Sequence, residues 1–495
     1  MILAVQTAAD VREMEERMLT ELPWLAPIGA LALAALGGVL LACLLPRSRH
    51  GIVGVYVAAG HLGAAGLAAW VWLDLGLRSR IAEIVVVDGL SLAVAGLLGA
   101  AGALTVALAW PYVRGSEREG EFYAVLAGTS LAATVLAAAG DIALLAIALG
   151  LLSLGSYVLT AYLRTSPRSN EAAIKYYVYG TVTGAAMVYG LTWWFGLGGS
   201  TDLAEIGQTL PEAPLAALGA STALVIGGLA YKASLVPFHF WAPDVYEGAP
   251  LPVAAYLSVL PKVAGLIALA RVLPLALPDD AANWSTAIAV IAAATMTVGN
   301  LAALTQRNVV RLLAYSSIAQ SGYLLMGVAA LPGSDLGLPA LVYYAIAYAA
   351  TNLAAFAVVI AVQRESGFVE IDAFAGLSRR HPWWTAALAL SFLSLLGLPP
   401  LSGFVGKLEV FTAAIDADQA WLAVVAILNT VVSLYYYLRV IAPTVLRPDT
   451  GALPPARSVP LSAALLASTA ATVLLGVVAE PVLRLAAASI ALVPG

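Results

Sequence analysis

The sequence contains few charged residues and almost no cysteine. Only 11% of its 495 residues are charged, 61% are hydrophobic, and the mean hydropathy is +0.91. A soluble protein cannot wet its surface with so little charge, so the composition predicts an integral membrane protein. The single cysteine, Cys43, excludes an internal disulfide, a cysteine-based zinc site and a four-cysteine iron–sulfur cluster.

Sequence motifs for nucleotides and nucleic acids are also missing. No strand followed by GxGxxG and no GxxxxGKS/T loop occurs, which leaves no recognisable site for a nucleotide. The net charge is −5 and no basic cluster is present, so we expect no nucleic-acid partner. Segment 1–22 lacks the basic start and long apolar core of a secretory signal, and we expect a short N-terminal extension there.

Apolar runs long enough for membrane-spanning helices recur along the whole chain. A helix needs about 20 apolar residues to cross roughly 30 Å of hydrocarbon, and the runs predict an all-α polytopic membrane protein with about fourteen transmembrane helices. Pro237 interrupts the seventh run and Pro399–Pro400 interrupt the twelfth. The two interrupted runs are five spans apart. Since each span crosses the membrane once, a unit repeated after an odd number of spans has the opposite orientation, so we expect two inverted five-helix repeats containing broken helices.

These runs define the expected organisation of the chain. It comprises the extension (1–22), helices 1–3 (23–120), a first repeat of helices 4–8 (121–274), a second, inverted repeat of helices 9–13 (283–442), and C-terminal helix 14 (443–495). The odd-numbered connections carry most of the arginines: Arg47, Arg49, Arg114, Arg118, Arg164, Arg168, Arg307, Arg311, Arg364, Arg379, Arg380, Arg439, Arg447 and Arg457. The even-numbered ones carry only Arg78, Arg80 and Arg271. The positive-inside rule therefore predicts both termini on the outer side of the membrane.

Three lysines lie inside or beside the interrupted apolar segments. An ammonium near the middle of a bilayer costs roughly 2.5–3.5 kcal/mol on insertion scales, so such a lysine is a functional hypothesis by default. Lys232 and Lys262 are too deep for their side chains to reach surface water, and Lys407 follows the Pro399–Pro400 break. Proline frees backbone carbonyls that water can meet, and burial makes a lysine switchable by nearby charge. We predict that the three form a proton relay.

Other polar residues near these lysines have competing interpretations. His239 fits a capping or hydrogen-bonding residue as well as a proton relay, and Lys407 also fits an interfacial anchor. We expect Asp244 and Glu247 to be turn and helix-cap residues rather than proton carriers. Seven further polar residues either hold water in the path or form hydrogen bonds between helices. They are Asn300, Tyr315, Ser316, Ser317, Gln320, Ser321 and Tyr323.

Three segments carry a resemblance to a known family. They are YKASLVPFHFWAPDVYEGAPLPV from Tyr231, NLAALTQRNVVRLLAYSSIAQSGYLL from Asn300, and LPPLSGFVGKLEVF around Lys407. They resemble the N-type antiporter-like subunit of respiratory complex I, the proton-pumping NADH:quinone oxidoreductase, and the resemblance covers about residues 85–442. DVYEGAP and the lysine at 407 are similar to the N-type rather than the M-type.

The resemblance implies both an architecture and a set of partners. It implies fourteen helices in two inverted repeats and a proton path through a fifth-helix glutamate and lysines that match Lys232, Lys262 and Lys407. Lys175 matches a further family position at the cytoplasmic start of the sixth helix. No cofactor is implied in this chain, whereas NAD, FMN, iron–sulfur clusters and quinone belong to partner subunits. The implied partners are M-type and small K/J-type membrane-arm subunits and membrane lipids, in the bacterial plasma (inner) membrane.

The family's fifth-helix glutamate is missing from this sequence, because its position holds Gly150. Asp141 is about 13.5 Å away along a helix and on the opposite face, so it cannot replace that glutamate. We expect a hydrated gap near Gly150 or a partner-subunit carboxylate reaching it. Gln320, where many relatives have histidine, is a second departure. Two alternatives stay open: a subunit of an Mrp-like cation/proton antiporter, and a non-pumping structural spacer, which the missing glutamate favours.

Overall fold

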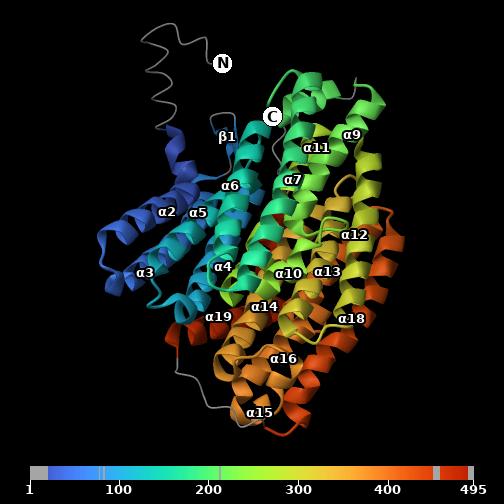
Figure 1. Cartoon of the computed structure of the whole chain (residues 1–495). Helices are drawn as coiled ribbons and strands as arrows, with labels where there is room; N and C mark the ends of the chain where they lie inside the picture. The colour runs from blue at the N-terminus through green and yellow to red at the C-terminus, as the bar shows by residue number, and fades with distance from the viewer. Residues whose placement is uncertain (1–19, 77, 82–83, 211–212, 450–457, 489–495) are drawn as a thin grey trace.

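The computed structural model describes residues 20–76, 78–81, 84–210, 213–449 and 458–488, which form a bundle of helices (Figure 1). Most of the expected N-terminal extension, and Arg457, lie outside these residues. The long helices are α2 (Ala26–Leu44), α3 (Gly51–Trp70), α4 (Gly89–Val113), α5 (Glu119–Ala137), α6 (Ile142–Thr160), α7 (Pro167–Gly198), α9 (Leu215–Ala233), α11 (Leu251–Ala276), α12 (Ala281–Ala303), α13 (Val309–Ala329), α14 (Gly337–Ser366), α16 (Pro382–Leu396), α17 (Ser402–Asp416), α18 (Ala420–Leu446) and α19 (Val459–Val477).

Shorter elements join or flank these helices. They are η1 (Leu22–Leu25), η2 (Arg47–Arg49), η3 (Val71–Leu75), α8 (Leu203–Thr209), α10 (Trp241–Gly248), η5 (Ile371–Phe374), α15 (Leu377–Arg380) and α20 (Glu480–Ala488), with strands β1 (Arg78–Ile81) and β2 (Val85–Val87). The two strands form an antiparallel pair that the sequence did not predict. The C-terminal helix 14, expected within 443–495, is divided into α19 and α20, because Pro481 has no N–H with which to continue α19.

The composition of the helices confirms an all-α polytopic membrane protein. Twelve helices of the described residues are long and apolar enough to cross a membrane. α7 is not among them, although its 32 residues are long enough for a span. The twelfth apolar run, interrupted at Pro399–Pro400, consists of two 15-residue helices, α16 and α17. The number fourteen, the inverted repeats and the domain boundaries stay predictions.

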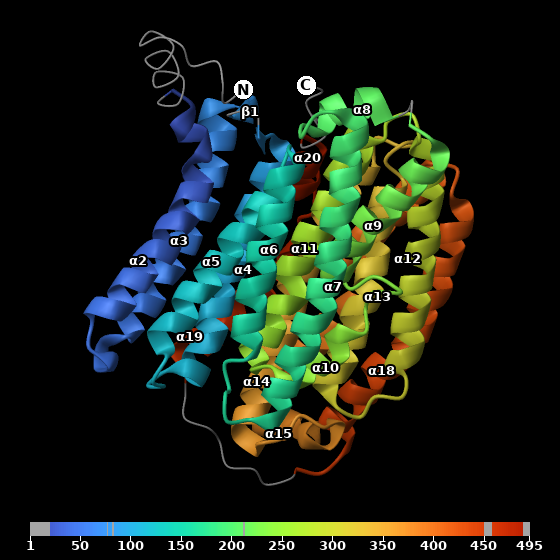
Figure 2. The ribbon, with the colours of Figure 1, turned by 45° about the horizontal axis from the view of Figure 1, so that its top comes forward.

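The centre of the bundle consists of α11, α13 and α14 (Figures 1 and 2). The buried share of an 18-residue apolar stretch differs from helix to helix. It is 100% in α11 and 94% in both α13 and α14, but only 22% in the span containing α2. α2 and α3 lie at one edge of the molecule, far from α12 and α18 (Figure 2). Polar side chains on α11 and α13 are therefore shielded from lipid by other helices, which is where ionisable groups are tolerated in membranes.

Two helices are interrupted at the expected prolines. The first break, residues 234–240, separates α9 from α10 and contains Ser234 in the left-handed region (φ 58°). The second break, residues 397–401, separates α16 from α17 and begins with Gly397 at φ 92°. Each interruption leaves backbone groups without helical partners inside the protein, and other groups must satisfy them.

Candidate functional site

The four lysines of the chain mark the candidate site. The sequence contains 20 arginines but only Lys175, Lys232, Lys262 and Lys407. The last three are 0%, 0% and 3% exposed. Among the described residues, none of these three ammonium groups lies within ion-pair distance of a carboxylate; their hydrogen bonds go to hydroxyl and carbonyl oxygens.

Lys232 lies in the last turn of α9, just before the first break. Its Nζ donates to Ser153 Oγ of α6 at 3.2 Å and to the Tyr176 hydroxyl of α7 at 3.3 Å. The same nitrogen lies 5.3 Å from the centre of the Tyr176 ring and 5.9 Å from that of Tyr157. Two neighbouring helices thus supply the polar contacts of Lys232, while the aromatic faces attract its positive charge.

Lys262 lies in the middle of α11, in the most buried part of the bundle. Its Nζ donates to Ser317 Oγ of α13 at 2.5 Å and lies 5.6 Å from the centre of the Tyr246 ring of α10. The Tyr246 hydroxyl is 3.2 Å from the same Ser317 oxygen. Ser317 therefore joins Lys262 to the short helix that follows the first break.

Lys407 follows the second break, on α17. Its Nζ donates to the Leu396 carbonyl at 3.0 Å and to Thr430 Oγ1 at 3.2 Å, and lies 4.3 Å from the centre of the Tyr323 ring. Leu396 is the last residue of α16, so this lysine satisfies a carbonyl that the break frees. These contacts lie in the protein interior and do not support an anchor at the membrane surface.

α13 supplies polar side chains to both Lys262 and Lys407. Gln320 donates from Nε2 to the Leu395 carbonyl at 3.0 Å and accepts a short hydrogen bond from the Tyr344 hydroxyl. Gln320 and Lys407 thus satisfy adjacent carbonyls at the end of α16. Tyr323, whose ring faces Lys407, has its hydroxyl 3.2 Å from Thr430 Oγ1. The sequence singled out these α13 residues, but not the carbonyls that they contact.

The expected position of the missing acid is open. A side chain at Gly150 would have nothing within 4 Å of its first carbon, and neighbouring Leu151 and Leu154 are both 56% exposed. Ser153, one helical turn away, contacts Lys232. Asp141 accepts hydrogen bonds from the N–H groups of Ala143 and Leu144 and caps α6, far from this position. The structure therefore leaves room at Gly150, on the outer surface of α6.

His239 is buried but is not part of the hydrogen-bonded contacts of the lysines. Its side chain lies in the first break and is 7% exposed. Within the described part of the chain, its Nδ1 has no hydrogen-bond partner. Its ring packs 4.5 Å from that of Phe240, centre to centre. The predicted relay role of His239 stays a prediction.

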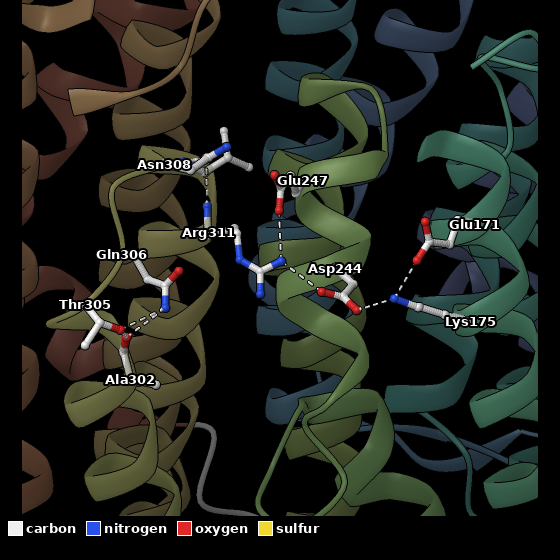
Figure 3. A network of polar contacts seen from close by, with 10 residues as sticks. Glu171, Lys175, Asp244, Glu247, Ala302, Thr305, Gln306, Asn308 and Arg311 are labelled. Carbon is white, nitrogen blue, oxygen red and sulfur yellow. Dashed lines mark hydrogen bonds and ion pairs between the residues drawn. The ribbon is translucent and has the colours of Figure 1, made fainter. Parts of the chain in front are cut away.

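A charged network surrounds Lys175 beside α10 (Figure 3). Lys175 Nζ lies 2.8 Å from Glu171 Oε1 and 2.7 Å from Asp244 Oδ2. Arg311 Nη1 lies 2.8 Å from both Asp244 Oδ1 and Glu247 Oε2. These residues and Arg168 line a cavity of about 250 Å³.

The network corrects the expected roles of Asp244 and Glu247. Both residues lie within α10, where neither caps a helix, and both form ion pairs because α7 and α13 bring cations to α10. Partial desolvation opposes ionisation of Asp244, but the hydrogen bonds from Lys175 and Arg311 outweigh it and hold the pKa of this carboxyl below its usual range. Asp244 is therefore ionised at neutral pH.

The ion pair between Arg271 and Asp88 was not predicted from the sequence, because Arg271 was placed in a connection. It lies inside α11, is 1% exposed, and donates to both carboxylate oxygens of Asp88, at 2.8 and 2.9 Å. Asp88 also caps α4 together with Ser91. An arginine inside an apolar helix was the available signal. In the described residues, no group of three or more His, Cys, Asp or Glu side chains is placed to hold a metal ion.

Comparison with known proteins identifies close relatives of the chain. Residues 139–433 match the family described as NADH:quinone oxidoreductase/Mrp antiporter, transmembrane. The chain is 40% identical to NADH-quinone oxidoreductase subunit N 1 of Streptomyces griseus, over 94% of this chain and 98% of that protein. It is 31% identical to a chain of respiratory complex I from Thermus thermophilus with bound aureothin, with a TM-score of 0.78 over 93% of this chain and 99% of that one.

A further solved structure shares the fold. A chain of the Mrp complex from Dietzia sp. superposes with a TM-score of 0.83, over 95% of this chain and 97% of that one. The two sequences are 23% identical, so this likeness shows the architecture alone.

Proposed function

The chain belongs to the NADH:quinone oxidoreductase/Mrp antiporter transmembrane family, and from this premise we propose that it is a proton-translocating membrane-arm subunit of complex I. Quinone reduction in other subunits drives protons through a relay of Lys232, Lys262, Lys407 and intervening water. Lys175 and His239 are secondary members of the path. The partners are M-type and small K/J-type subunits in the bacterial plasma membrane, and NAD, FMN, iron–sulfur clusters and quinone are bound by partner subunits.

One observation carries the proposal: the three buried lysines contact hydroxyl groups rather than carboxylates. A hydroxyl accepts a hydrogen bond from a charged ammonium and donates one to a neutral amine. A carboxylate would instead favour the charged form of its partner. Hydroxyl partners therefore suit a lysine that gains and loses a proton, as a relay requires.

The two alternatives differ in their support. The matching family covers both NADH:quinone oxidoreductase and the Mrp antiporter, and a fold likeness at 23% identity adds to the Mrp-like alternative. The subunit N assignment has the stronger support, because a relative of that name is 40% identical over nearly the whole chain. The spacer alternative is favoured by one observation, the absence of an acid beside Lys232 in the described residues. The three buried lysines without a carboxylate partner argue against a spacer, because burying an ammonium group in a membrane protein is unfavourable and a spacer has no use for it.

Replacement of Lys262 by alanine tests the proposal in the assembled complex. We expect NADH-driven proton uptake by proteoliposomes and quinone reduction to fall together by about tenfold or more, because a titratable group is lost from the path. The matched control is Arg484→Ala, which removes a cation whose side chain is 79% exposed. Normal rates of both processes in an assembled Lys262→Ala complex would support the spacer alternative.

A further inference from the structure

Helix α10 contacts the partners of two buried lysines. Towards α7, the Trp241 ring stacks on the Tyr176 ring with centres 4.3 Å apart, and the Tyr176 hydroxyl accepts from Lys232. Towards α13, Tyr246 contacts Ser317, which accepts from Lys262. Because α10 has only eight residues, we expect a movement of this helix to shift the hydroxyl partners of both lysines.

Asp244, in the first turn of α10 and between Trp241 and Tyr246, ties α10 to the same two helices. One carboxylate oxygen contacts Lys175 of α7 at 2.7 Å, and the other contacts Arg311 of α13 at 2.8 Å (Figure 3). Lys175 immediately precedes Tyr176, and Arg311 lies less than two helical turns before Ser317. Each helix that gives a cation to Asp244 thus gives a hydroxyl to one buried lysine.

We propose that Asp244 is a positioning residue for both Lys232 and Lys262, an inference that rests on the proposed relay and extends it. Its carboxylate fixes α10 between α7 and α13, and this fixes the Tyr176 and Ser317 hydroxyls relative to the two ammonium groups. Asp244 itself carries no proton in this scheme. It acts through the helices that it joins.

The two connections made by Asp244 are not equally replaceable. Glu247, also on α10, contacts Arg311 at 2.8 Å and keeps α10 joined to α13 when Asp244 is lost. The other carboxylate at Lys175 is Glu171, which lies on α7 itself and cannot join α7 to α10. Loss of Asp244 should therefore loosen α10 from α7, on the side of Lys232, more than from α13.

The test compares three variants in the assembled complex reconstituted in liposomes. Asp244→Ala should lower coupled turnover about fivefold with an unchanged KM for quinone, and Asp244→Glu should recover most of it. Glu171→Gln is the matched control, because it removes a Lys175 ion pair without separating two helices, and it should stay within about twofold of wild type. Asp244→Asn, which keeps the size of the side chain and removes only its charge, provides the test if Asp244→Ala does not assemble.

A labelling measurement reports on the position of α10 without reference to pumping. Lys175 is the exposed lysine of the chain, at 39% for its side chain, so a water-soluble acylating reagent followed by mass spectrometry reads its environment. Asp244→Ala should increase acylation of Lys175 by about threefold, and Asp244→Glu should not. Wild-type turnover in assembled Asp244→Ala, or failure of Asp244→Glu to recover activity, would overturn the inference. If Lys262→Ala also retains wild-type pumping, the proposed function fails instead.

Discussion

The two broken helices place their lysines differently. At the first break, neutral groups satisfy the backbone: the Trp241 indole donates to the Tyr231 carbonyl at 2.9 Å, and Thr295 Oγ1 accepts from the Val236 N–H at 3.0 Å. At the second break, Lys407 itself donates to the freed Leu396 carbonyl. The hydrogen bonds of Lys232 thus all go to hydroxyls of other helices, whereas one hydrogen bond of Lys407 goes to a carbonyl of its own break.

This difference separates a fixed lysine from an adjustable one. Lys407 has the backbone carbonyl of its own break, which remains while the break persists, in addition to a hydroxyl of α18 and an aromatic ring of α13 at 4.3 Å. Lys232 loses its contacts when α6 or α7 moves. We therefore propose that Lys407 passes protons on from a fixed position in the relay. Lys232, by contrast, has a position that changes with the conformation of the protein.

The largest effect should come from removing the titratable group at the second break. Lys407→Gln keeps a donor for the Leu396 carbonyl, so the complex should assemble, but it cannot carry a proton. We expect proton uptake by proteoliposomes to fall by about tenfold. If assembly and pumping both survive, Lys407 has only a structural role and does not pass protons on.

An intermediate effect should distinguish the two lysines directly. Tyr176→Phe leaves Lys232 with the Ser153 hydroxyl as its single hydrogen-bond partner and should lower coupled turnover about threefold or more. Thr430→Val leaves Lys407 its carbonyl partner and its ring, and should lower turnover less than about twofold. Quinone-reductase and proton-uptake rates of the two assembled variants provide the measurement. Equal losses would remove the contrast between a fixed and an adjustable lysine.

The smallest effect should come from restoring the missing acid. A side chain at position 150 has free space, and Gly150→Glu places a carboxylate on α6 one turn from Ser153, which contacts Lys232. We expect an increase in pumping of about twofold, because the carboxylate supports the charged lysine between transfers. Gly150→Gln, of the same size without the charge, is the control. No difference between the two variants would favour the spacer alternative.

The sequence predicted the lysines and the breaks because both are local signals. A lysine inside an apolar run and a proline inside a span are visible without neighbours, and Lys232, Lys262 and Lys407 are all buried as expected. The partners of Asp244 come from residues 69 and 67 positions away, so only the packing of α7, α10 and α13 reveals its role. The Asp88–Arg271 pair, 183 positions apart, was invisible for the same reason.

Proton uptake and NADH oxidation, measured together in proteoliposomes that contain the Lys262→Ala complex, test whether protons cross this chain through its buried lysines. Lys262 is fully buried and its ammonium group donates to the single hydroxyl of Ser317, so its replacement removes a titratable group from the centre of the bundle. We expect both rates to fall together in an assembled Lys262→Ala complex. A wild-type proton-to-electron ratio at wild-type turnover would contradict this expectation.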